Sequence, residues 1–478
     1  MRRTEVKCGA CGSLSGVLAA ILLVSSCFVV VVVEAATGLN DKVDSTTTID
    51  PSQSNGANGF VSAVHKVRFV HDNNEEEEWP AEATAAKRNN YDPHAPPSVG
   101  PWFEGWYTRV VDREGKYSFG IMAGSFCGSG VSCNYDANLP GYMALIQQVI
   151  PFNSSSSASS SSSKAATEDQ AVLIAFKQRL LEGKAFASYN TNATAMEVWE
   201  LFPNATSITI KKGEPVDVNP DFSSPPDFEW KILGGEGEDG AGCFFRNDAV
   251  YYVSKSQGVK FSAKFKNPLY WEKNKPGEGP EGNAIYLPLQ QHWFVYSLGS
   301  DAVWQFLQQN SSVSLSGSGW AHQEKNWGVS FPKAWIWSEG MAENNTRHFA
   351  VTGGNVPVIG PIAVTAWLVG YRSPRINWSF RPQNVLTSFT PGIDACSGSF
   401  NMTVQTPVTK RLVFTMKAPV KTYTPLSVPS LQGWVPDGCV ETYVAETVVE
   451  AYENGYLVDW TVFHNSALEF GGEYMCKP

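Results

Sequence analysis

The chain has 478 residues, of which 17% are charged and 12% aromatic, and its formal net charge is −10. This balance excludes a largely disordered chain, a coiled coil and a collagen-like fibre. The acidic balance also argues against a nucleic-acid partner, because phosphate backbones are bound by basic patches that release counterions. A length roughly three times that of a typical domain predicts two globular domains with tails.

The N-terminus has the pattern of a secretory signal peptide. Two arginines and Lys7 form a positive region, an apolar run extends from Val17 to Val33, and Glu34-Ala35-Ala36 offers small residues for cleavage. We therefore expect residues 1–35 to be a leader that lies outside the fold. An uncleaved membrane anchor is the second interpretation, since the apolar run is at the short limit for crossing a bilayer.

The cysteines and sequons agree with export. Six cysteines follow the leader, and an even number in a secreted chain predicts up to three disulfides, although some could be buried free thiols. Cys127 and Cys133 close a short Gly/Ser loop and are the best candidates for one bridge. With seven Asn-x-Ser/Thr sequons, the chain is expected in the secretory pathway or outside the cell. Delivery through the endoplasmic reticulum to a plastid is the alternative, if the source is an alga with a secondary plastid.

Beyond the leader, composition predicts an all-β protein. Residues 36–90 have the polar, acidic composition of a flexible linker. From Tyr91 onward, short aromatic and β-branched runs alternate with Gly, Pro, Asn and Ser, which favours antiparallel β-sandwiches or barrels. A polar cluster near Gln308–Gly319 suggests two β domains, 91–312, with a serine-rich insertion at 153–165, and 313–478. Asp169–Leu181 fits a helix, although part of it equally suits a strand.

The first unusual block is Pro101–Tyr107, with the sequence PWFEGWY. If it is a strand, Trp102, Glu104 and Trp106 share one face. A buried carboxyl between two indoles should have a raised pKa, and a carboxyl kept neutral can act as a general acid. The alternative is that the block only packs, with Glu104 paired to an arginine.

The second block is Gly319–Gly328, with the sequence GWAHQEKNWG. On a strand, Trp320, His322, Glu324 and Asn326 share a face, and His322 beside Glu324 could relay a proton. The alternative is a hydrogen-bonded structural network. No cysteine and histidine spacing here or elsewhere predicts a metal site.

The third block is Ser466–Gly472, with the sequence SALEFGG. It is interpreted as a strand that closes a sheet, with a bulge at the glycine pair. No phosphate-binding loop, nucleophile elbow or dinucleotide fingerprint occurs in the chain.

Taken together, these blocks resemble the tocopherol cyclase family. Phe103–Tyr107, preceded by Pro93-His94, is similar to the opening motif of that family. Glu324–Gly328, followed by Phe331-Pro332-Lys333 and Trp335-x-Trp337, is the most specific match. Ala467–Gly472 resembles the closing motif, and His292-Trp293 matches a shorter element. The resemblance covers roughly residues 91–475 and implies two lipocalin-like β-barrel halves, with a more distant similarity to carotenoid 1,2-hydratases.

The resemblance implies closure of a chromanol ring on a prenylated hydroquinone, without a cofactor or metal. An acid protonates the alkene of the prenyl tail, and the phenol oxygen captures the resulting cation. Chemistry and strand alternation suggest Glu104 as the acid, with Glu324 or His322 as the alternative, and His94 as the group that orients or deprotonates the phenol. The expected substrate contacts are Trp102, Trp106, Tyr107, Asn326, Trp327, Trp335 and Trp337.

The expected ligand is a hydrophobic prenylquinol or another isoprenoid lipid, with peripheral membrane contact as a further expectation. Two other functions compete with the cyclase. One is a secreted lipocalin-type protein that binds isoprenoids or quinones without turnover, and the other is a structural glycoprotein.

Overall fold

The computed structural model describes most of the chain from Asp92 to Cys476 and four short strands before it. The described ranges are 17–24, 27–34, 68–70, 76–78, 92–133, 140–150, 193–202, 205–211, 228–234, 241–273, 275–287, 289–342, 344–359, 362–384, 386–407 and 409–476. The expected serine-rich insertion, most of the expected linker and the segment Asp169–Leu181 lie outside the described residues.

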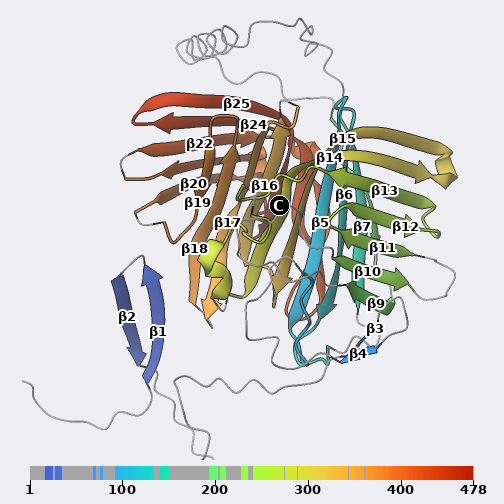
Figure 1. Ribbon diagram of the computed structural model, residues 1–478, viewed down its shortest axis with the longest axis horizontal. Coiled ribbons are helices and arrows are strands. Elements are labelled where there is room, and N and C mark those ends of the chain that lie inside the picture. Colours follow the sequence, from blue (N-terminus) through green and yellow to red (C-terminus); the bar gives the residue numbers. More distant parts are fainter. Residues whose placement is uncertain are drawn as a thin grey trace, which may run out of the picture. The chain divides into compact units, whose positions relative to one another are not determined.

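An antiparallel sheet of eleven strands forms the first half of the fold (Figure 1). In chain order its strands are β5 (Trp102–Asp112), β6 (Tyr117–Cys127), β7 (Gly141–Val149), β8 (Glu197–Leu201), β9 (Ala205–Lys211), β10 (Glu229–Gly234), β11 (Gly242–Arg246), β12 (Ala249–Ser254), β13 (Val259–Lys266), β14 (Gln291–Gln308) and β15 (Val313–Gly328). Their order in the sheet is β8-β7-β6-β5-β15-β14-β13-β12-β11-β10-β9. The sheet curls into a half-barrel, so that the hydroxyl of Tyr252 on β12 donates to the carbonyl of Trp199 on the edge strand β8, at 3.1 Å.

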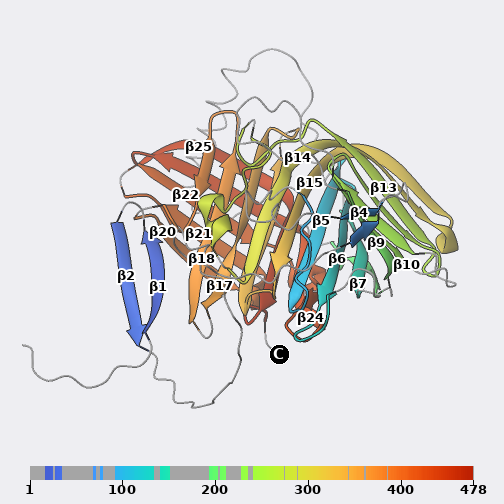
Figure 2. The same ribbon diagram turned by 60° about the horizontal axis from the view of Figure 1, so that its bottom comes forward.

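A second antiparallel sheet, of ten strands, forms the other half (Figure 2). Its strands are β16 (Ala334–Ala342), β17 (Arg347–Ile359), β18 (Ile362–Arg372), β19 (Asn377–Phe380), β20 (Ser388–Asp394), β21 (Ser399–Gln405), β22 (Lys410–Lys417), β23 (Thr424–Pro429), β24 (Trp434–Glu453) and β25 (Tyr456–Gly472). The order is β19-β18-β17-β16-β25-β24-β22-β21-β20, and β23 pairs with β24.

The remaining elements are short. Strands β1 (Val17–Val24) and β2 (Cys27–Glu34) pair with each other in a unit of their own, and β3 (Arg68–Val70) pairs with β4 (Glu76–Glu78). The short 3-10 helices are η3 (Gly282–Tyr286), η4 (Gln309–Ser311), η5 (Ala395–Ser397) and η6 (Val420–Thr422). No helix among the described residues is long and apolar enough to span a bilayer. The expected all-β class is confirmed.

Strand periodicity explains how each sheet builds its core. In β13, Val259, Phe261 and Phe265 are buried, while Lys260 and Lys264 between them are exposed. Side chains of this kind fill the half-barrel, a second apolar cluster covers one face of the second sheet, and a third cluster lies where the two sheets meet. The third cluster is the one that positions the candidate site.

The chain does not pass from the first sheet to the second at the expected domain boundary between residues 312 and 313. Strand β15 begins at Val313 and pairs with β14 and β5, so it belongs to the first sheet. The chain enters the second sheet only at Ala334. The polar cluster near Gln308–Gly319 is therefore the hairpin turn between β14 and β15 together with the exposed start of β15, rather than a link between sheets.

Two disulfides are present among the described residues. The expected bridge between Cys127 and Cys133 is confirmed, and a second joins Cys396 to Cys476. Cys243 and Cys439 are buried free thiols. These two bridges are consistent with an extracellular protein.

Candidate functional site

The two adjacent strands β5 and β15 carry most of the residues that the motifs singled out. Glu104 is paired with Trp327 across these strands, and Tyr107 is paired with Glu324. Because successive side chains of a strand point to opposite faces, Glu104 and Trp327 face the half-barrel, whereas Tyr107 and Glu324 face the second sheet. The two predicted acids, Glu104 and Glu324, therefore lie on opposite faces of one sheet and cannot act on the same reacting atom.

Glu104 is held in a buried ion pair. Its Oε1 lies 3.0 Å from Nζ of Lys325 and 2.8 Å from Nδ1 of His94, and its Oε2 accepts the backbone N–H of His94 at 2.8 Å. Burial by itself would raise the pKa of Glu104, but the charges of Lys325 and His94 and the hydrogen bonds from His94 outweigh it and hold the pKa below its usual value. The expectation of a raised pKa is therefore wrong, and Glu104 is ionised at neutral pH. Its partner is a lysine from the neighbouring strand rather than an arginine.

Trp327 is enclosed by cationic and imidazole groups. Its ring lies 4.6 Å from the ring of His94 and 5.2 Å from that of His292, and Nζ of Lys325 lies 4.8 Å above it. Nδ1 of His292 lies 2.8 Å from Oε2 of Glu281. We call His94, Glu104, Glu281, His292, Lys325 and Trp327 the imidazole cluster.

The imidazole cluster fastens a preceding segment of the chain to the sheet. Nζ of Lys325 also donates to the carbonyl of Asp92 at 2.5 Å, and the bonds from Glu104 hold His94. The cluster thus joins Glu104 of the first sequence block and Lys325 and Trp327 of the second block to His94 and His292 in one network.

Trp102 and Trp106 share a strand face but lie in different surroundings. Trp102 packs beside the Cys127–Cys133 bridge. Trp106 stacks on Trp230 at 4.7 Å in the core of the half-barrel. Neither of these tryptophans reaches the layer between the sheets.

A different pair of carboxyls lies in that layer. Glu441 on β24 is directly opposite Glu469 on β25. The hydroxyl of Tyr107 lies 3.2 Å from Oε1 of Glu441 and 3.1 Å from the hydroxyl of Tyr443. The indole N–H of Trp335 donates to Oε1 of Glu469. We call Tyr107, Trp335, Glu441, Tyr443 and Glu469 the carboxyl pair site.

This environment favours an un-ionised carboxyl. Glu441 is 1% exposed, and both its burial and the neighbouring charge of Glu469 raise its pKa well above the usual range. Removal from water also raises the pKa of Glu469, to about 7. The pair therefore retains a proton at neutral pH. Oε2 of Glu441 has no protein partner in the structure, which leaves one oxygen of this acid available to a ligand.

Paired charges surround the carboxyl pair site. Arg109 lies 2.5 Å from Oε1 of Glu339, and its guanidinium lies 4.9 Å from the centre of the Tyr443 ring. Nε2 of His322 lies 2.8 Å from Oε2 of Glu324. Burial lowers the pKa of His322, but the hydrogen bond to Glu324 and the charge of Glu339 outweigh this and raise it. The expected pairing of His322 with Glu324 is thus present, with both groups buried.

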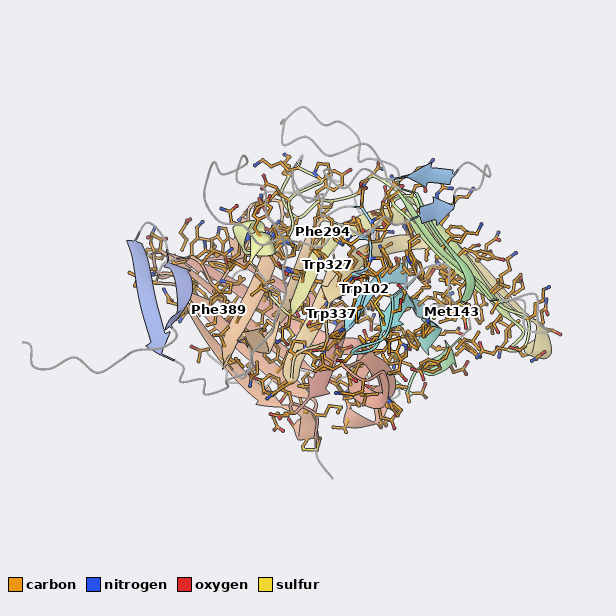
Figure 3. All side chains as sticks on the ribbon, turned by 90° about the horizontal axis from the view of Figure 1, so that it is seen from below. Trp102, Met143, Phe294, Trp327, Trp337 and Phe389 are labelled. Atoms are coloured by element: carbon orange, nitrogen blue, oxygen red, sulfur yellow. A yellow bond between two sulfur atoms is a disulfide. The ribbon has the colours of Figure 1, made fainter. Side chains whose placement is uncertain are left out.

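The remaining predicted residues also belong to this face. The ring of Trp337 lies 5.0 Å from that of Tyr107, and its N–H donates to Glu324 at 3.1 Å. Figure 3 shows Trp337 where the two sheets adjoin, and labels Trp327, which belongs to the core of the half-barrel, near it in this view. Asn326 is half-buried and accepts a hydrogen bond from Gln291 at 3.1 Å. The structure therefore unites Tyr107, Trp335 and Trp337 with a carboxyl that the motif analysis missed.

The sequence contains a weak signal for the missed acid. Glu441 and Tyr443 stand two residues apart in the stretch 439–445, whose other residues are apolar or β-branched, so they share a buried face. Among the described residues, no group of three His, Cys, Asp or Glu side chains could hold a metal ion.

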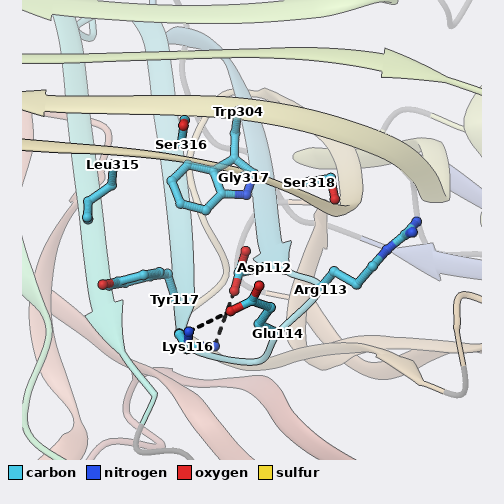
Figure 4. A pocket seen from close by; sticks show the side chains of 10 residues that line it. All are labelled: Asp112, Arg113, Glu114, Lys116, Tyr117, Trp304, Leu315, Ser316, Gly317 and Ser318. Carbon is cyan, nitrogen blue, oxygen red and sulfur yellow. Dashed lines mark hydrogen bonds and ion pairs between the residues drawn. The ribbon is translucent and has the colours of Figure 1, made fainter.

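A small pocket of about 240 Å³ opens away from both clusters (Figure 4). It lies beside the turn between β5 and β6, where Trp304 and Tyr117 meet Asp112, Glu114 and Lys116. None of the residues of the carboxyl pair site lines it. The layer between the sheets is itself filled by aromatic and aliphatic side chains.

Comparisons with known proteins give a distant likeness in structure alone. CghA, solved with Sch210972, is similar with a TM-score of 0.47 and 8% identity, over 79% of this chain and 90% of CghA. A candidate AttH from Nitrosomonas europaea is similar with a TM-score of 0.33 and 10% identity, over 77% of this chain and 92% of the other. No family model and no curated protein matches the sequence. At these identities, neither ligands nor reactions transfer to this chain.

Proposed function

We propose that this protein closes an oxygen ring on a prenylated hydroquinone by acid catalysis, as the resemblance to tocopherol cyclases implies, and that Glu441 is the acid. The observation that carries the proposal is a carboxyl pair held between two sheets beside tyrosine and tryptophan rings, where removal from water raises the pKa of both carboxyls. Such a carboxyl is un-ionised at neutral pH and is shielded from water, which are the two requirements for protonating an alkene.

The residues divide the reaction between them. Glu441 donates its proton to the less substituted alkene carbon, and the tertiary cation that forms faces the rings of Tyr107 and Trp337. The phenol oxygen bonds to the cation, its O–H bond breaks, and the Glu469 carboxylate takes that proton. Transfer of the proton from Glu469 to Glu441 restores the starting state. Substrate and product are isomers, so no electrons enter or leave.

The prenyl tail must part the packed layer to reach Glu441. Trp335, Trp337 and Tyr107 belong to the apolar cluster that fills this layer, and they must move when a ligand enters. Ligand binding should therefore change tryptophan fluorescence even where no reaction follows. This gives a measure of binding that is independent of turnover.

Turnover of a panel of prenylated benzoquinols tests the proposal. The wild-type chain should give a single chromanol enantiomer, and Glu441→Gln should bind the same quinols without converting them. Glu453→Gln, an exposed carboxyl on the same strand, is the matched control and should react normally. Binding by the wild type with the quinol recovered unchanged would instead establish the carrier function.

A further inference from the structure

Three loops join to form one end of the structure near the start of β5. They are the segment before β5, the loop after β6 and the turn between β23 and β24. The backbone N–H of Ser129 donates to the carbonyl of Leu431 at 2.9 Å, and that of Gly100 donates to the carbonyl of Val131 at 2.8 Å. Loops from both sheets are thereby tied into one surface.

This surface exposes an unusual amount of apolar side chain. Val99 and Val131 are each 54% exposed, Phe202 is 52% exposed and Leu431 is 40% exposed. The ring of Trp434 lies 6.1 Å from that of Phe202 and connects it to the turn that carries Leu431. We call these five residues the apolar tip. An exposed patch of this kind marks a binding surface more often than chance.

The backbone of the apolar tip suits contact with lipid. Its loops use their N–H and C=O groups on one another, as in the bonds from Gly130 to Gly100 and from Cys133 to Ser98. A polar group that enters an apolar medium unpaired is costly, whereas a paired one is not. The disulfide between Cys127 and Cys133 closes the loop that presents Val131. Several backbone groups of the tip are therefore already paired before the tip meets lipid.

The charges favour a neutral lipid surface over other partners. The stretches 96–101, 127–133 and 430–436 contain no Lys, Arg, Asp or Glu, and the exposed Asp437 that follows the third stretch adds a negative charge and no basic one. A protein partner is normally met by a polar rim, and an anionic membrane by basic residues. The whole chain carries a charge of −10, which would oppose an anionic surface.

We infer that the apolar tip docks this protein on the surface of a zwitterionic lipid bilayer. Val131 and Leu431 enter the boundary between headgroups and acyl chains, and Trp434 supports them at the interface. The inference goes beyond the proposed reaction, because docking needs no turnover. A failure to dock would therefore leave the acid role of Glu441 untouched.

Cosedimentation of the full chain with phosphatidylcholine vesicles tests the inference. The wild type should pellet with the vesicles, and the double variant Val131→Asp/Leu431→Asp should bind at least about tenfold more weakly, since two apolar side chains are lost from the contact. The milder double variant Val131→Ser/Leu431→Ser should show an intermediate loss of vesicle binding. It serves as a second test in case the aspartate variant does not fold. Val303→Asp, at a valine 57% exposed on β14, is the matched control and should bind as the wild type does.

Four results would overturn the inference. The first is a wild-type chain that stays in solution, and the second is equal loss of binding in Val303→Asp and in the tip variants. The third is a dimer of the wild type that Val131→Asp dissociates, which would make the tip a protein interface. Added phosphatidylserine should not strengthen binding, and a marked gain would show that charge, not the apolar tip, drives docking.

Discussion

Glu441 and Glu469 face each other across strands β24 and β25, so two carboxyls occupy one site. Two carboxylates that are removed from water at paired positions of neighbouring strands cannot both ionise easily, and the pair retains a proton at neutral pH. Glu104 shows the opposite behaviour, because Lys325 lies 3.0 Å away and stabilises its charge. The carboxyls of Glu104 and of the Glu441–Glu469 pair are all removed from water, so the opposite directions of their pKa shifts come from their charged neighbours.

The pH profile of kcat/KM should rise near pH 7. The pKa of Glu469 is raised to about 7 by its removal from water, and this group must be ionised to accept the phenol proton. kcat/KM should therefore increase as pH passes about 7, and should fall only at a much higher pH, where Glu441 ionises. Glu469→Gln should lose the rising limb. A rate that only falls as pH rises through 7 would contradict this assignment.

The carboxyl pair should make the fold less stable as pH rises from acidic to neutral. An acid with a raised folded pKa holds its proton more tightly in the folded state, so stability falls as pH rises from 4.5, the ordinary value, through about 7. We expect a loss of roughly 1–3 kcal/mol in the free energy of unfolding across this window. Urea denaturation at several pH values should show that the free energy of unfolding of Glu469→Gln falls less steeply with pH than that of the wild type. If the free energy of unfolding of that variant depended on pH as the wild type's does, the raised pKa of Glu469 would be contradicted.

Glu104→Gln should damage stability rather than chemistry. Removing one partner of a buried ion pair leaves the charge of Lys325 uncompensated and should cost about 3–5 kcal/mol. Because the folded pKa of Glu104 is lowered, its stabilising effect should also vanish in the wild type as pH falls through that pKa.

The double variant Glu104→Gln/Lys325→Met separates the two roles of Glu104. It removes both charges and should recover much of the lost stability. Turnover per folded molecule should match the wild type in both variants. A stable Glu104→Gln protein without activity would restore Glu104 as a catalytic candidate.

Gly120 should be essential for the position of Tyr443. A Cβ atom at residue 120 would lie 1.9 Å from the hydroxyl oxygen of Tyr443, so Gly120→Ala must displace the phenol from Tyr107. We expect a loss of about 1–3 kcal/mol, which adding Tyr443→Phe should relieve only in part, because the ring carbon Cζ would still lie 2.9 Å from the new Cβ. Gly105→Ala is the control, since its nearest neighbour would lie at an ordinary 3.5 Å. Strictly additive losses in the Gly120 and Tyr443 double-mutant cycle would disprove the clash.

Strand alternation predicted faces correctly but could not predict partners. It showed that a carboxyl at residue 104 points the same way as Trp106, yet the pKa of Glu104 depends on Lys325, more than 200 residues later in the chain. The same limit applies to disulfides. Cys127 and Cys133 are close enough in sequence to suggest a bridge, whereas Cys396 and Cys476 are brought together only by the fold.

The carboxyl pair could not be predicted from the sequence motifs. Glu469 belongs to the third sequence block, where it is interpreted as part of a closing strand, and Glu441 belongs to no block. Their significance comes from the register of β24 against β25, which no single stretch of sequence reveals. The all-β class was predictable because each short apolar run carries its own signal.

Infrared spectroscopy of the ligand-free protein tests the protonated carboxyl most directly. At about pH 8, above the ordinary pKa of any glutamate, the wild type should still show the C=O stretch of a buried, protonated carboxylic acid. The band should disappear in Glu441→Gln and persist in Glu453→Gln. Its absence from the wild type, or its survival in Glu441→Gln, would contradict the assignment of Glu441 as the acid.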